Sequence, residues 1–151
     1  MTDTSELIGA LLDSCCEQVL ETMCFSSVLD HPEHPMRFDR DHVVATMAFT
    51  GKPSGIFEAE ADFEALRIMT AGFMGIDEAE ATEQQMNDLL TEFSNMTCGL
   101  ALSSLARVEY FHLATPVAER RFEQMDETGG VRRCYELLGG MLAVSLRVDF
   151  D

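Results

Sequence analysis

Residues 82–106, TEQQMNDLLTEFSNMTCGLALSSLA, have the pattern of one long amphipathic helix. Thr82 and Gln85 have the spacing of a capping box, in which each side chain binds a backbone amide at the helix start. Apolar residues then recur at steps of three and four, the period of one buried helical face. They are Met86, Leu89, Leu90, Phe93, Met96, Leu100 and Leu105. We therefore expect a helix packed on a core, with the other elements arranged around it.

The opposite side of this helix carries a polar ridge formed by Asp88, Glu92, Asn95 and Gly99. These positions also follow helical steps, so their side chains share one face. Asparagine is a weak helix former because its amide competes for backbone hydrogen bonds, and its place in mid-helix therefore needs a reason. A solvated helix face is the simplest explanation of such a pair of polar residues, and this alternative stays open.

The same residues resemble the motif of the CheC/CheX group of chemotaxis phosphatases. In that motif an acidic residue or serine is followed by Glu-x-x-Asn and, later, by a proline. Asp88, Glu92 and Asn95 fit the first three positions, and Pro116 follows slightly earlier than the family spacing. The first apolar segment, residues 3–25, has no second Glu-x-x-Asn, so the chain is most similar to the single-site CheX type.

This resemblance implies a protein phosphatase that hydrolyses phosphoaspartate on a CheY-like receiver domain. Asn95 would orient the attacking water, since a carboxamide both donates and accepts hydrogen bonds, as glutamine does in GTPases. Glu92 would pair with a lysine of the receiver, and Asp88 would support that contact. The receiver would bring the Mg²⁺, with no metal or cofactor bound by this chain. The resemblance also implies a homodimer formed through the sheet.

The remaining pattern predicts an α+β domain spanning residues 1–151, with a mostly antiparallel sheet and long helices packed on one face, as in the CheC/CheX group. Before the central helix we expect a helix over 3–25, strands over 42–50 and 56–61, and a helix to about residue 74 capped by Asp62. After it we expect a strand over 108–114, a loop or short edge strand over 117–128, and a hairpin of 131–138 with 141–150. Gly139-Gly140 is typical of the two-residue hairpin turn.

Charge and composition exclude several classes of function. The formal net charge is −17, and Lys52 is the only lysine, so nucleic acid and anionic membranes are poor partners. No apolar run approaches the roughly 20 residues that cross a bilayer. The first residues are polar and acidic, unlike the basic start of a signal peptide. These features together indicate a cytoplasmic protein.

Two alternatives to the phosphatase remain. One is a non-catalytic module of the same fold that binds a receiver or another protein. The other is a metal- or thiol-dependent protein that uses His31, Glu33 and His34 or the cysteines. We favour a stiff polar loop over a metal site there, because the segment contains two prolines. The five cysteines form no CxxC pair, which indicates free thiols.

Overall fold

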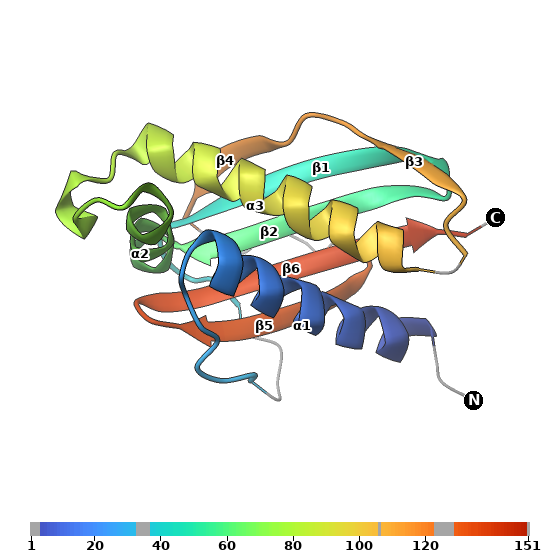
Figure 1. Ribbon diagram of the computed structural model, residues 1–151, viewed down its shortest axis with the longest axis horizontal. Coiled ribbons are helices and arrows are strands. Elements are labelled where there is room, and N and C mark those ends of the chain that lie inside the picture. Colours follow the sequence, from blue (N-terminus) through green and yellow to red (C-terminus); the bar gives the residue numbers. More distant parts are fainter. Residues whose placement is uncertain (1–3, 33–36, 106, 123–128, 151) are drawn as a thin grey trace.

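The computed structural model describes residues 4–32, 37–105, 107–122 and 129–150. Its elements are α1 (Thr4–Met23), β1 (His42–Lys52), β2 (Ser54–Asp62), α2 (Phe63–Met74), the 3₁₀ turn η1 (Glu78–Glu80), α3 (Glu83–Ser104), β3 (Tyr110–Leu113), β4 (Val117–Arg121), β5 (Val131–Leu137) and β6 (Gly140–Asp149). The predicted α+β class and the order of helices and strands are confirmed (Figure 1).

The strands form one sheet in the order β3-β1-β2-β6-β5, and β4 also pairs with β1. Every strand pair within the described residues is antiparallel. β3 and β4 lie along the same edge of β1, and the buried Pro116 stands in the gap between them. Proline has no backbone donor, so it suits the point where the ladder is interrupted. The segment predicted as a loop or short edge strand contains β4, while residues 123–128 lie outside the described part of the chain.

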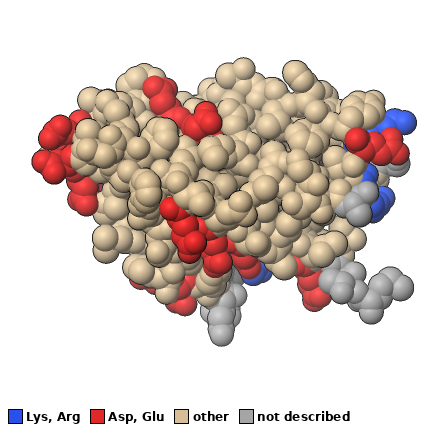
Figure 2. Space-filling view, in the orientation of Figure 1, with Lys and Arg blue, Asp and Glu red and all other residues tan. Residues whose placement is uncertain are grey.

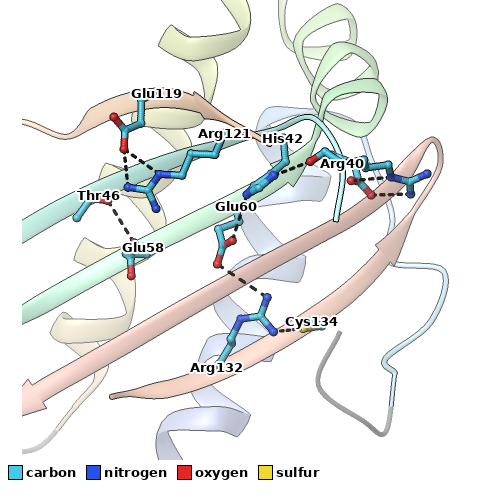
Figure 3. A network of polar contacts seen from close by, with 10 residues as sticks. Arg40, His42, Thr46, Glu58, Glu60, Glu119, Arg121, Arg132 and Cys134 are labelled. Atoms are coloured by element: carbon cyan, nitrogen blue, oxygen red, sulfur yellow. Dashed lines mark hydrogen bonds and ion pairs between the residues drawn. The ribbon is translucent and has the colours of Figure 1, made fainter. Parts of the chain in front are cut away.

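The three helices cover one face of the sheet (Figure 1). The core lies between the two layers and includes Phe57 and Val144 from the sheet and Leu12, Leu66 and Phe93 from the helices, all at most 1% exposed. The other face of the sheet carries a network of polar side chains, and the helices lie behind it in Figure 3. There the buried Glu60 carboxylate lies 3.7 Å from His42 Nε2 and 3.8 Å from Arg132 Nη2.

Asp62 does not cap α2 as predicted. It occupies the N-cap position, but its side chain makes no capping hydrogen bond. The carboxylate instead accepts hydrogen bonds from Arg40 Nε at 3.2 Å and Arg40 Nη2 at 3.1 Å. It also accepts from the backbone amide of Met141, at 2.8 Å. Partners from distant segments therefore take the carboxylate away from the helix end.

The turn between β5 and β6 also differs from the prediction by one residue. Leu137 pairs directly with Gly140, so the two-residue loop is Leu138-Gly139 and not Gly139-Gly140. Both glycines have positive φ, 92° and 149°, which a side chain would strain. The paired glycines were a correct signal for the hairpin, but the register places the second one at the start of β6.

No helix within the described residues is long and apolar enough to cross a membrane.

Candidate functional site

The polar ridge lies on α3, whose start has the predicted capping box. Thr82 Oγ1 accepts from the Gln85 amide at 3.1 Å, and Gln85 Oε1 accepts from the Thr82 amide at 3.0 Å. The buried face of the helix consists of Met86, Leu89, Leu90, Phe93, Ser94, Thr97, Cys98, Ala101 and Leu102. Because this face is held against the core, the ridge of Asp88, Glu92 and Asn95 is turned outward.

The ridge residues differ in whether their side chains interact with other residues of the chain. Asp88 is exposed and accepts a hydrogen bond from Gln84 Nε2 at 2.8 Å. Glu92 is exposed and Asn95 is half-buried, and neither side chain has a hydrogen bond or ion pair with another described residue. The carboxylate and the carboxamide are therefore available to a ligand or a partner.

The ridge ends where α3 reaches the edge of the sheet. Gly99 lies one turn beyond Asn95, and a Cβ built on it would lie 3.7 Å from Leu113 Cδ1 of β3. α3 also contacts β4, and Arg120 Nη1 of β4 lies 3.5 Å from Glu83 Oε1 at the start of the helix. The sheet edge and the second half of α3 thus border the site on one side.

On the other side, the ridge borders a groove of about 910 Å³ between three helices. Its walls include Phe25 just after α1, Phe73 and Met74 at the end of α2, and Asp88, Glu92 and Met96 of α3. Met96, predicted in the buried stripe of α3, is 41% exposed and belongs to this groove. The ends of α1 and α2 leave this side of α3 open. The spacing of apolar residues along α3 alone does not reveal this. Phe25, Phe73 and Met74 had no recognisable motif in the sequence.

The described residues form no ligand set that would support the metal-binding alternative. His31 Nε2 lies 2.9 Å from Glu17 Oε1, and its ring contacts the edge of Tyr135. Glu33 and His34 lie outside the described residues. Within the described part of the chain, no group of three His, Cys, Asp or Glu side chains is placed to hold a metal ion.

The thiols are poorly suited to nucleophilic chemistry. None of the five cysteines forms a disulfide, and all five are buried. Burial raises the pKa of the Cys98 thiol on α3 to about 12, and that of Cys24 likewise to about 12. Burial also raises the pKa of both Cys15 and Cys16. These thiols are therefore protonated at neutral pH, whereas the thiolate is the nucleophile.

The helical face of the molecule is acidic. In Figure 2 the red of Asp and Glu recurs across this face, while the blue of Lys and Arg is confined to its right and lower margins. Such a surface repels free phosphate esters and favours a partner that carries its own positive charge.

The family model of the chemotaxis phosphatase CheX matches residues 43–128, more than half of the chain. The chain belongs to the CheX family. The match includes all of α3 and therefore the whole ridge. Among curated proteins, none matches the chain by sequence.

Solved structures of CheX proteins share the fold of this CheX-family chain. The chemotaxis protein CheX from Vibrio vulnificus has a TM-score of 0.77 at 17% identity, covering 98% of this chain and 100% of that one. CheX from Desulfovibrio desulfuricans has a TM-score of 0.73 at 17% identity, covering 95% and 99%. A CheX–CheY–BeF₃–Mg²⁺ complex from Borrelia burgdorferi matches with a TM-score of 0.68 at 16% identity, covering 92% and 96%.

Proposed function

We propose that this chain hydrolyses phosphoaspartate on a CheY-like receiver domain of a response regulator. The observation that carries the proposal is the ridge, where Glu92 and Asn95 stand one turn apart with no partner among the described residues. Membership of the CheX family supports a phosphatase, and the Borrelia burgdorferi complex supports a CheY-like partner.

The proposed reaction needs little chemistry from this chain. An acyl phosphate is already activated, and the receiver brings its own Mg²⁺ and a lysine to hold the phosphoryl oxygens. The Asn95 carboxamide holds a water in line with the phosphorus: its oxygen accepts a hydrogen bond from one O–H of the water, and its N–H donates to the water oxygen. The new P–O bond forms as the bond to the aspartate carboxylate breaks, giving inorganic phosphate. The rate gain comes from orientation, since a neutral amide is no base.

Glu92 is assigned the role of setting the register of α3 against the receiver. It lies one turn before Asn95 on the exposed ridge, where its carboxylate reaches a lysine beside the phosphorylated aspartate. Asp88, one turn earlier, adds negative charge to the same contact, although Gln84 already holds its carboxylate. An ion pair of this kind improves register and encounter rate as well as affinity.

A non-catalytic module of the same fold is the second candidate, because exposed apolar side chains adjoin the ridge. Phosphorylated receivers from the same genome should be incubated with the chain, and both binding and phosphate release recorded. Faster release supports the phosphatase. Binding with release at the receiver's own rate supports the module.

We expect the purified chain to hold no tightly bound metal, because the Mg²⁺ required comes with the receiver. Elemental analysis should then find less than about 0.1 equivalent of zinc, iron or manganese per chain, since a structural or catalytic site is close to fully occupied. Stoichiometric zinc or iron would contradict this expectation and favour the His31 segment as a ligand source.

We also propose that the chain forms a homodimer through its sheet. No strand within the described residues pairs with the outer edge of β3 or β4, and Tyr110, Val117 and Phe122 are 60%, 67% and 65% exposed there. Open edges with exposed apolar residues favour pairing with another chain.

Light scattering at micromolar concentration should therefore give twice the 16.8 kDa of one chain. Val117→Asp should shift the equilibrium towards monomer with little loss of stability, because the residue is exposed. A wild-type chain that stays monomeric at 16.8 kDa would contradict the proposal.

A further inference from the structure

The groove beside the ridge exposes an unusual amount of apolar side chain. Phe25 is 79% exposed, Phe73 49%, Met74 42% and Met96 41%. The four side chains line the same groove, with Phe25 just after α1, Phe73 and Met74 at the end of α2, and Met96 in the middle of α3. Contiguous exposed apolar surface marks interaction sites, and exposed methionines adapt to a partner's shape.

Phe25 is held in a backbone conformation that favours glycine. Its φ is 52°, and in this left-handed turn the Ser26 amide reaches back to the Leu20 carbonyl oxygen at 3.0 Å. A bulky residue rarely adopts this left-handed backbone conformation, whereas glycine adopts it without strain. The phenyl ring is also the most exposed of the large apolar side chains described. Neither this backbone conformation nor the exposed ring stabilises the fold. A contact with another molecule therefore better explains a phenylalanine at position 25.

Gly72 brings the ends of α1 and α2 together to form the groove. A Cβ on this residue would lie 2.1 Å from the Cys24 carbonyl oxygen, far inside van der Waals contact. The close approach places Phe25 and Phe73 on adjoining walls. Close backbone packing of Cys24 on Gly72 therefore holds these two walls of the groove together.

The groove is continuous with the ridge. With 3.6 residues per turn, Met96 lies roughly 40° to one side of Glu92 on α3, and Asn95 lies roughly 60° to the other side. Glu92 thus stands between the groove and the carboxamide. A partner that reaches both Glu92 and Asn95 must also cover the neighbouring wall of the groove.

We propose that this groove is the docking surface for the receiver domain, and that it takes apolar side chains lying beside the receiver's lysine. The inference rests on the proposed function and adds to it the surface that selects the partner. Asp88 and Glu92 line the groove, and none of its described lining residues is a lysine or arginine. This charge favours a cationic partner surface. A second copy of this chain would face the same carboxylates with its own, and is therefore disfavoured.

Two variants test the proposal, with a third as a matched control. Phe25→Gly removes the ring and relieves the backbone, and Met96→Ala shortens the opposite wall. Each should raise both the Kd for the phosphorylated receiver and the KM about tenfold, as loss of a well-placed interface residue does. For both variants kcat should change less than about twofold, and Phe25→Gly should melt no lower than wild type. Leu7→Ala, 53% exposed at the far end of α1, should change none of these quantities.

The outcomes distinguish a failure of the docking proposal from a failure of the proposed function. If wild type releases phosphate and both groove variants keep its Kd and KM, the groove is not the docking surface and the phosphatase stands. If wild type binds the receiver without hydrolysis and the variants lose binding, the groove stands and the phosphatase fails. If wild type binds no receiver from the same genome, or if the groove variants abolish self-association seen by light scattering, the docking proposal is wrong.

Discussion

Asn95→Ala is expected to lower the rate of receiver dephosphorylation about a hundredfold, because misplacing a reacting group by about 1 Å costs that much. The amide is the only group of this chain assigned to the attacking water, so its loss should act on kcat. Binding of the phosphorylated receiver should persist, since Glu92 and the groove remain. Stability should change by only about 0.5 kcal/mol, as at other sites that are not fully buried.

Asn87→Ala is the matched control for this variant. Asn87 is also half-buried on α3 but lies off the ridge. Its loss should leave kcat for dephosphorylation unchanged. If Asn95→Ala keeps wild-type hydrolysis, the assignment of the water-orienting role is wrong and the ridge is only a solvated face.

Glu92→Ala is expected to act mainly on binding. An ion pair in a partly desolvated contact contributes about 2 kcal/mol, which corresponds to about 30-fold in Kd. Glu92→Lys should weaken binding further, because it sets two cations against each other. Calorimetric titration with a phosphorylated or fluoroberyllate-activated receiver measures both effects.

Glu78→Lys controls for the change in net charge. Glu78 is exposed on η1 and does not line the groove, yet its substitution alters the total charge by the same amount. If Glu78→Lys weakens binding as much as Glu92→Lys does, the effect is long-range electrostatics. In that case no specific pair with Glu92 is needed.

Local chemistry explains why the sequence predicted α3 so closely. The helix was predicted over 82–106 and is found as Glu83–Ser104, since the capping box fixes its start within four residues of chain. The ridge was equally predictable from the sequence, because residues three and four apart share a helical face whatever the rest of the fold does. The strands followed from alternation and glycine turns in the same way.

Features that depend on contacts between distant segments could not be predicted from the sequence. Asp62 has the sequence position of a cap, but Arg40 and the Met141 amide, which lie far along the chain, bind its carboxylate instead. Met96 has the spacing of a core residue, but α1 and α2 end before they cover it. The groove needs the approach of Gly72 to Cys24, and no local pattern encodes that contact.

The most direct test of the phosphatase proposal is multiple turnover on a receiver labelled with ³²P at its aspartate. The chain should be added at one-tenth of the receiver concentration with Mg²⁺ present. We expect all of the label to appear as inorganic phosphate, faster than by the receiver's own hydrolysis, with none on this chain. An unchanged rate of label loss, or label transferred to the chain itself, would contradict a mechanism in which Asn95 presents water to the phosphorus.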